Sequence, residues 1–188
     1  MKTALLFLAE GFEEVEAVTP IDFLRRAGIK VETVGIGGPE ITGGHGIQIT
    51  ADITFSDLDE VLLDSADILI FPGGMPGASN IAAEKRVISI IQEFNRKGKL
   101  IAAICASPAV ILSPSGVLEG RSATCYPGME KAFSSGTTYS SERVVVDRNI
   151  VTSRGPGTAM VFSYVIVKLL EGRLVAEDLI EKALYEVS

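Results

Sequence analysis

Cys105 is the residue of this chain whose type and surroundings best suit chemistry. It follows the apolar run Leu100–Ile104, which has the length and composition of a buried strand. Ala103 and Ser107 lie two positions before and after it, and Pro108 begins an apolar helical pattern. The tight strand-to-helix turn of a nucleophile elbow requires small residues at these two positions. A thiol at the start of a helix is expected to have a lowered pKa. The pattern therefore predicts a reactive thiolate, with a cysteine that only packs in the core as the alternative.

A pair of glycines, Gly73 and Gly74, follows the apolar run Ala66–Phe71. Glycines let the backbone turn its N–H groups towards a neighbouring site. Together with the N–H group that follows Cys105, they could form an oxyanion hole, which stabilises negative charge on an oxygen. The alternative is a simple glycine turn, which is the commoner use of such pairs.

Three carboxylates, Glu13, Glu14 and Glu16, open the first predicted helix. Carboxylates in a first helical turn are favoured by the helix dipole and usually face water. Glu13 and Glu16 are three residues apart and share a helix face, so one of them could point into a cleft at the strand ends. The loop Ser153–Thr158 could line the same pocket or merely turn the chain.

The elements that must position these residues follow from an alternation of short apolar runs with amphipathic segments. The runs predict strands at 4–9, 31–36, 66–71, 100–104 and 121–126, an edge hairpin around 37–50, and a second hairpin over 142–153. The amphipathic segments predict helices between Gly11 and Gly28, over 57–63, 77–83, 85–97 and 108–112, from Gly157 onwards, and over 175–186. This alternation predicts an α/β fold with a mostly parallel sheet and helices on both faces. Active sites in such folds lie beyond the carboxyl ends of the strands.

Length, composition and charge limit the classes of protein that the chain can represent. Its 188 residues, 47% hydrophobic and 22% charged, predict one globular domain over 1–188. The net charge of −7 without a basic cluster argues against nucleic acid as a partner. No apolar run is long enough to cross a bilayer, which argues against a membrane partner. Cys105 and Cys125, in a chain without a recognisable secretory signal, predict reduced thiols and a cytoplasmic location.

Four motifs in order along the chain carry a resemblance to a known family: residues 9–16 (AEGFEEVE), 71–74 (FPGG), 102–106 (AAICA) and 152–158 (TSRGPGT). Together they resemble the ThiJ/PfpI superfamily, in the branch of the human parkinsonism-associated protein deglycase and bacterial YajL. The resemblance implies a flavodoxin-like three-layer sandwich, a homodimer, and chemistry without a cofactor. It implies that Cys105 is the reactive cysteine and Glu16 its carboxyl partner. Gly73, Gly74 and Ala106 would be the backbone donors.

The activity that the resemblance implies is that of a glyoxalase or protein deglycase, acting on methylglyoxal or its early adducts. A thiolate at Cys105 would add to the aldehyde of a 2-oxoaldehyde, and backbone donors would stabilise the resulting oxyanion. Glu16 would move a proton between the adjacent carbons, and water would hydrolyse the thioester to a 2-hydroxy acid. Glu16 should then be protonated at rest, with a pKa raised by burial and coupled to the thiol. The alternative is a stress sensor or chaperone in which Cys105 is oxidised to a sulfinate without significant turnover.

The chain departs from the family where many relatives carry a histidine before a proline, because Tyr126 stands there. This weakens a Cys-His protease or glutamine amidotransferase interpretation, since both need a base beside the thiol. Tyr126 is predicted in the substrate pocket with Pro156 and Gly157, or as a structural tyrosine. The only histidine, His45, is expected near the site of a dimer partner or exposed on its loop. One histidine and two thiols do not favour a metal site.

Overall fold

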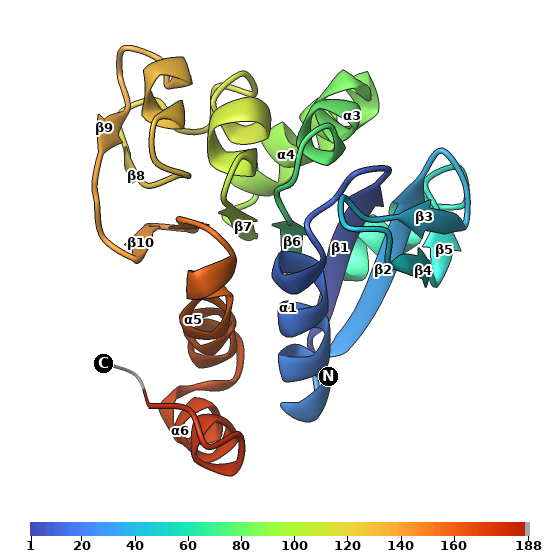
Figure 1. The fold of residues 1–188 in the computed structure, drawn as a ribbon, viewed down its shortest axis with the longest axis vertical. Coiled ribbons are helices and arrows are strands. Elements are labelled where there is room, and N and C mark those ends of the chain that lie inside the picture. The colour runs from blue at the N-terminus through green and yellow to red at the C-terminus, as the bar shows by residue number, and fades with distance from the viewer. Residues whose placement is uncertain (187–188) are drawn as a thin grey trace.

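The computed structural model describes residues 1–186, and a seven-stranded sheet lies at its centre (Figure 1). The strand order is β10-β11-β7-β6-β1-β2-β5, and every neighbouring pair is parallel except β10 with β11. The strands are β1 (Thr3–Ala9), β2 (Lys30–Ile36), β5 (Ile53–Thr54), β6 (Ile68–Phe71), β7 (Leu100–Ile104), β10 (Val144–Asp147) and β11 (Ile150–Ser153). The predicted mostly parallel sheet is confirmed.

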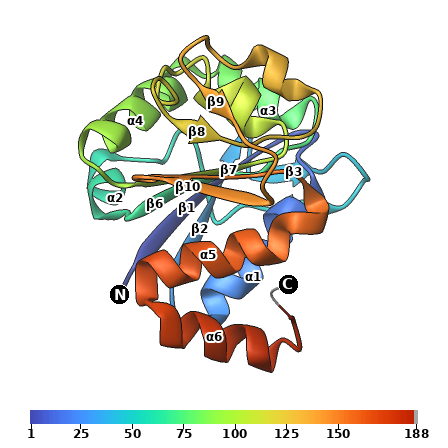
Figure 2. The same cartoon turned by 90° about the vertical axis from the view of Figure 1, so that its left-hand side faces the viewer.

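Helices cover both faces of this sheet and complete the predicted three layers. One face carries α1 (Glu14–Arg26), α5 (Ala159–Glu171) and α6 (Arg173–Lys182) (Figures 1 and 2). The other face carries α2 (Glu60–Ser65), α3 (Gly77–Ala83) and α4 (Lys85–Arg96). Short helical turns lie at η1 (Pro108–Leu112), η2 (Met129–Ala132) and η3 (Pro156–Thr158). Among residues 1–186, no helix is both long enough and apolar enough to span a bilayer.

The two helical layers bury both faces of the central strands. In β1, Leu5 and Phe7 pack in the core beneath α2, α3 and α4, whereas Leu6 and Leu8 pack in the core beneath α1 and α5. Successive side chains of a strand point to opposite faces, so such a strand must be apolar at every position. Each fully buried leucine or phenylalanine contributes roughly 1.5–3 kcal/mol. This explains why the central strands appear in the sequence as continuous apolar runs.

The hairpin predicted around 37–50 exists, although it is not an edge of the main sheet. Its strands β3 (Glu40–Thr42) and β4 (Gln48–Thr50) pair only with each other, antiparallel. The edge position belongs instead to the two-residue strand β5, which the sequence analysis did not predict. A strand this short offers too little alternation to be detected. The hairpin projects from the end of the sheet near the start of α1 (Figure 1).

Several predicted elements are shorter or displaced, among them the last helix, expected over 175–186 and found at Arg173–Lys182. The strand expected over 121–126 is reduced to β8 (Ser122–Ala123), which pairs in parallel with β9 (Thr138–Tyr139) in a separate small sheet. The helix expected over 57–63 begins only at Glu60, because the Asp59 carboxylate accepts a hydrogen bond from the Leu62 N–H at 2.8 Å and caps it. The hairpin of β10 with β11 is confirmed.

The helix expected after Cys105 is a five-residue π-helix, η1, rather than a regular α-helix. The parallel strands β1, β6, β7 and β11 all end at one edge of the sheet. The segments that follow these strands carry the acidic start of α1, the glycine pair, Cys105 and Arg154. The fold therefore brings the chemically suggestive motifs to one place.

Candidate active site

Cys105 sits in a strained turn at the carboxyl end of β7. Its backbone φ is 65°, a left-handed conformation that is rare for residues other than glycine and persists only where the surrounding structure enforces it. The Cys105 N–H donates to the Ser153 carbonyl at 2.9 Å, and the Cys105 carbonyl accepts from the Tyr126 N–H at 2.8 Å. Ala103 and Ser107 are fully buried on either side. The turn has the backbone geometry predicted for a nucleophile elbow.

The glycine loop is fixed against this elbow. The Ser107 hydroxyl donates to the Pro72 carbonyl at 2.5 Å, and both residues are buried. A Cβ atom added to Gly73 would lie 2.6 Å from the Cβ of Cys105, 2.6 Å from Oε2 of Glu16 and 3.0 Å from the Ala106 nitrogen. Only glycine fits this position, because any side chain would displace the cysteine or the carboxyl group.

Glu16 reaches this point from the first turn of α1, and its side chain is completely buried. Its Oε2 accepts a hydrogen bond from the Gly73 N–H at 2.8 Å, and Glu13 caps the helix by accepting from the Glu16 N–H at 2.7 Å. Its Oε1 is buried without a hydrogen-bond partner. Of the two glutamates that share a helix face, Glu16 is therefore the one that points inward. The Gly73 N–H donates to Glu16, so the N–H groups of Gly74 and Ala106 are the donors to the Cys105 sulfur.

The thiol and the carboxyl group titrate as a pair. Burial raises the pKa of Glu16 to about 7, and the charge of Glu13 adds to this, while hydrogen bonds from Cys105 and Gly73 act in the opposite direction. Burial and then the neighbouring Glu16 raise the pKa of Cys105 to about 12, against the hydrogen bonds from Gly74 and Ala106. Between these two values the pair holds one negative charge and one shared proton.

The raised pKa predicted for Glu16 is confirmed, whereas the lowered pKa predicted for the thiol is wrong. That prediction relied on a helix dipole, but η1 is a single five-residue turn, and desolvation together with the Glu16 charge outweighs the amide donors. A thiolate forms in this pair when the shared proton lies on Glu16. The sulfur then faces the N–H groups of Gly74 and Ala106, which stabilise its charge.

A cavity of about 300 Å³ lies next to this pair, and three of the predicted pocket residues, Tyr126, Pro156 and Gly157, line it. Gly155 connects the cavity to the carboxyl group, since a Cβ atom added there would lie 3.4 Å from the Tyr126 ring and 4.0 Å from Oε1 of Glu16. The Tyr126 phenol is about half-exposed. The unpartnered carboxyl oxygen of Glu16 therefore lies near Gly155, one of the residues that line the cavity.

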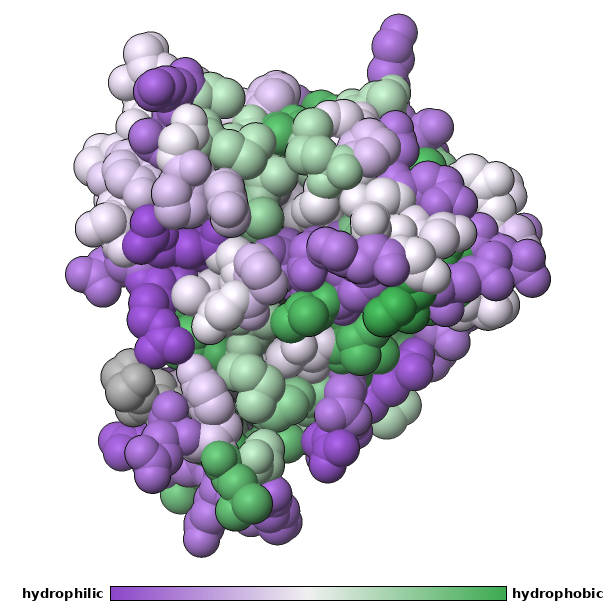
Figure 3. Space-filling view, viewed as in Figure 1, coloured by the Kyte–Doolittle hydropathy of each residue, from purple (hydrophilic) through white to green (hydrophobic). Residues whose placement is uncertain are grey.

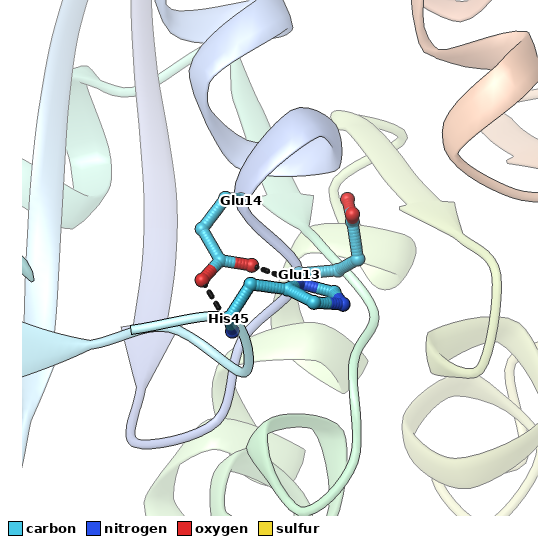
Figure 4. A group of neighbouring side chains, drawn as sticks. All are labelled: Glu13, Glu14 and His45. Carbon is cyan, nitrogen blue, oxygen red and sulfur yellow. Dashed lines mark hydrogen bonds and ion pairs between the residues drawn. The ribbon is translucent and has the colours of Figure 1, made fainter. Parts of the chain in front are cut away.

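His45, the fourth predicted pocket residue, does not line this cavity. It lies in the turn between β3 and β4 and is largely exposed (Figure 4). The ring Nδ1 of His45 lies 2.8 Å from Oε2 of Glu14, and the backbone N–H of His45 donates to Oε1 of Glu14 at 2.6 Å. Any role of His45 at the site of a partner subunit stays a prediction.

Glu13, Glu14 and His45 offer ligand atoms within 4.8 Å of one another, an arrangement not anticipated from the sequence. Figure 4 shows the Glu14 carboxylate held by the backbone and ring of His45. A third hydrogen bond to this carboxylate comes from the Ile47 N–H at 3.4 Å. Both Glu14 oxygens thus accept from nitrogens of the hairpin, and Glu13 is committed to capping α1. These bonds assign the cluster to anchoring the hairpin.

Residues 2–169 match the DJ-1/PfpI family. The chain belongs to this family. It is 40% identical over 174 residues to Protein dj-1beta of Drosophila melanogaster, covering 92% of this chain and 91% of that protein. It is 36% identical over 169 residues to Deglycase PfpI of Pyrococcus furiosus, covering 89% of this chain and 99% of that protein. It spans only 38% of the length of Protein DJ-1 homolog B of Arabidopsis thaliana, to which it is 36% identical.

Solved structures of the DJ-1/PfpI family show the same fold. A structure described as "Toxoplasma gondii DJ-1, oxidized" superposes with a TM-score of 0.92 at 34% sequence identity, covering 98% of this chain and 99% of that one. The predicted superfamily membership and flavodoxin-like architecture are therefore confirmed. One relative is named as a deglycase, and one similar structure is described as oxidised.

Sequence reasoning missed two residues that shape the site. Glu14 was expected to face water with its neighbours, yet it is buried beneath the hairpin. The glycine-rich turn at 43–46 could have indicated that another group packs closely against it, because a Cβ atom at Gly43 would overlap the Glu14 carboxylate. Arg154 was quoted only as part of a motif, yet it lines the cavity beside Tyr126.

Proposed function

We propose that this DJ-1/PfpI protein is a cofactor-free enzyme that converts 2-oxoaldehydes of the methylglyoxal type, or their early adducts, into 2-hydroxy acids. The observation that carries the proposal is a thiol and a buried carboxyl group that share one proton, with two backbone N–H groups aimed at the sulfur. The relative named Deglycase PfpI supports it. A pair of this kind can supply both the nucleophile and the proton carrier.

The reaction would begin with the shared proton on Glu16. The Cys105 thiolate adds to the aldehyde carbon, and the N–H groups of Gly74 and Ala106 are close enough to the sulfur to stabilise the new oxyanion. Glu16, once deprotonated by protonating that oxygen, removes the proton from the former aldehyde carbon and returns it to the adjacent carbon, while the hydroxyl proton passes from the oxygen of the first carbon to the oxygen of the second. The product is a thioester of a 2-hydroxy acid, and water hydrolyses it to regenerate the thiol.

The buried Oε1, which has no hydrogen-bond partner, is what suits Glu16 to this task. One carboxyl oxygen is fixed by Gly73, so the group cannot rotate freely, and the other has no protein partner. A carboxyl group with a pKa of about 7 gives and takes a proton readily at neutral pH. A surface glutamate with an ordinary pKa would be mostly ionised and a poorer acid.

The direct test is lactate formation from methylglyoxal. The wild-type protein is expected to form lactate, and Cys105→Ser is expected to lose at least about 100-fold in kcat/KM, since it removes the nucleophile. Cys125→Ser is the matched control, because Cys125 is the other thiol and is buried. Equal lactate formation by wild type and Cys105→Ser would contradict the proposal.

A second function has its own supporting observation. The similar structure described as oxidised indicates that at least one family member is found in an oxidised form. In this chain Cys105 is partly accessible and Cys125 is fully buried, so peroxide would reach Cys105 first. We propose a cytoplasmic location, whose reducing conditions would keep the thiols reduced until such stress occurs.

This sensor function is tested by mass spectrometry after mild peroxide treatment. Two added oxygens are expected on Cys105 before any appear on Cys125, because only Cys105 is near solvent. Glu16→Gln is a useful comparison, since it changes the carboxyl partner but not the thiol. Equal oxidation of the two cysteines in the wild type would rule out a selective sensor.

We propose that the protein is a homodimer through α1 and the β3–β4 hairpin. Val15, Val18 and Ile47 are 50%, 46% and 56% exposed. Figure 3 shows strongly hydrophobic residues gathered over the start of α1 and beside the hairpin. Sedimentation velocity should give a dimer for the wild type and a monomer for Val15→Glu, with Leu174→Glu on α6 as the control. A monomeric wild type would contradict the proposal.

A further inference from the structure

Two arginines, Arg143 and Arg154, line the cavity beside Tyr126 in a chain whose net charge is −7. Among the described residues that line this cavity there is no aspartate or glutamate. Arg143 has interactions elsewhere, including a hydrogen bond from its Nη2 to the Tyr185 hydroxyl at 3.1 Å. Arg154 is therefore the cation of this cavity to consider, and the proposed turnover of neutral methylglyoxal does not require it.

Arg154 is the residue whose bonding is incomplete. Its Nε is buried and has no hydrogen-bond partner. Its guanidinium donates only through Nη1, to the Ser141 carbonyl at 3.3 Å. Within residues 1–186, no carboxylate lies within 4.0 Å of this guanidinium to form an ion pair. Because Nε is buried, a ligand in the cavity would bond the guanidinium through its Nη2 end, which makes no hydrogen bond within residues 1–186.

The position of Arg154 relates it to the reacting pair. The residue directly precedes Gly155, which separates the Tyr126 ring from Oε1 of Glu16. Cys125, the residue before Tyr126, feels the charge of Arg154, although the Glu130 carboxylate acts on it in the opposite direction and more strongly. A small molecule attached to Cys105 that extends past Gly155 would therefore enter the cavity between Tyr126 and Arg154.

We infer that this cavity binds a carboxylate carried by the substrate, and that Arg154 is a specificity-determining residue. This inference rests on the proposed function for the identity of the reacting carbonyl. The substrate class is then an early adduct of a 2-oxoaldehyde with a carboxylate-bearing thiol or amino acid, rather than the free neutral aldehyde. A guanidinium is suited to this task, because its N–H groups match the geometry of a carboxylate.

The anion preference can be measured on Cys105 without any turnover. Two methanethiosulfonate reagents carry tails of opposite charge, a 2-sulfonatoethyl group and a 2-(trimethylammonio)ethyl group, and each rate is divided by the rate of the same reagent with a free thiol. The thiolate attacks the sulfenyl sulfur, a disulfide forms, the S–S bond of the reagent breaks, and methanesulfinate leaves with the electron pair. A Cys125→Ser background confines the reaction to Cys105.

The anionic reagent is expected to react about fivefold faster than the cationic one, the ratio that about 1 kcal/mol gives for a partly exposed charge pair. Arg154→Gln should abolish this preference and Arg154→Lys should retain part of it. Arg148→Gln, which removes one charge from the distant β10–β11 turn, should change nothing. Equal rate ratios in the wild type and Arg154→Gln, or a faster cationic reagent in the wild type, would overturn the inference.

The substrate class is tested with two adducts of methylglyoxal. The hemithioacetal with N-acetylcysteine carries a carboxylate, and that with N-acetylcysteamine does not. The wild type should convert the first with about fivefold higher kcat/KM, and Arg154→Gln should convert both alike. Failure of the wild type to convert free methylglyoxal and both adducts, with the anion preference at Cys105 intact, would refute the proposed function alone, whereas turnover of the adducts without a charge preference in either experiment would refute only the inference.

Discussion

Two buried glutamates, Glu14 and Glu16, lie two residues apart in the first turn of α1 and behave in opposite ways. Burial by itself raises the pKa of each. Glu14 accepts hydrogen bonds from the His45 ring, the His45 N–H and the Ile47 N–H, and these bonds lower its pKa overall. Glu16 accepts one backbone N–H, from Gly73, and its pKa rises to about 7.

The difference teaches that the depth of burial and the number of donors together decide whether a carboxyl group is ionised. A carboxylate whose oxygens are all bonded is a stable ion and an anchor. Glu16 has one carboxyl oxygen without a hydrogen-bond partner and lies next to a thiol. It keeps its proton up to about pH 7 and can transfer it. The helix presents the two groups to different surroundings: the hairpin covers Glu14, and the elbow faces Glu16.

The largest effect that tests this contrast is on catalysis. Glu16→Gln should lower kcat/KM for methylglyoxal by at least about 100-fold, because it removes the proton carrier. Glu14→Gln, a matched change two residues away, should stay within about threefold of the wild type, since the Glu14 carboxylate contacts the hairpin and not the reacting pair. Equal losses in the two variants would mean that Glu14 also serves the reaction.

The second effect is on stability as a function of pH. The folded protein holds the Glu16 proton up to about pH 7, whereas the unfolded chain releases it near 4.5. The contribution of Glu16 is therefore fully present below 4.5 and is lost as the pH rises through 7. Between pH 4.5 and 8, Glu16→Gln should gain about 3 kcal/mol of unfolding free energy relative to the wild type. Urea titrations at the two pH values measure this, and a pH-independent difference would contradict it.

Glu14→Gln should show a smaller effect of the opposite sign. The lowered pKa of Glu14 means that its contribution is present above 4.5 and is lost as the pH falls through the folded-state value. At pH 7 the variant should be destabilised by about 1–2 kcal/mol, because an amide nitrogen replaces one accepting oxygen. The deficit should shrink in acid. A loss of unfolding free energy in Glu14→Gln that grows as the pH falls would contradict the contrast between Glu14 and Glu16.

The smallest effect concerns His45. Its hydrogen bond with Glu14, and then the Glu14 charge, raise the pKa of the exposed imidazole above the model-peptide value of 6.5. In an NMR titration, Glu14→Gln should return the His45 pKa towards 6.5, and Glu16→Gln should leave it raised. An unchanged His45 pKa in Glu14→Gln would show that the hairpin is not held as described.

The sequence by itself determined the order of elements, the parallel sheet and the elbow around Cys105. It could do so because these depend on local patterns: apolar strands buried on both faces, and small residues at 103 and 107. Spacing left Glu13 and Glu16 as alternatives, and the family resemblance selected Glu16; the direction of its pKa shift then followed from a buried carboxyl group beside a thiol. Family membership followed from four motifs in the right order.

Only the tertiary structure decided what surrounds these groups. The burial of Glu14 depends on a hairpin 31 residues away in sequence, and the incomplete bonding of Arg154 depends on which segments fold around it. The thiol pKa was mispredicted for the same reason, since it required the sum of desolvation, a neighbouring charge and two amides. Electrostatic free energies are set by distances through space, and spacing along the chain does not supply those distances.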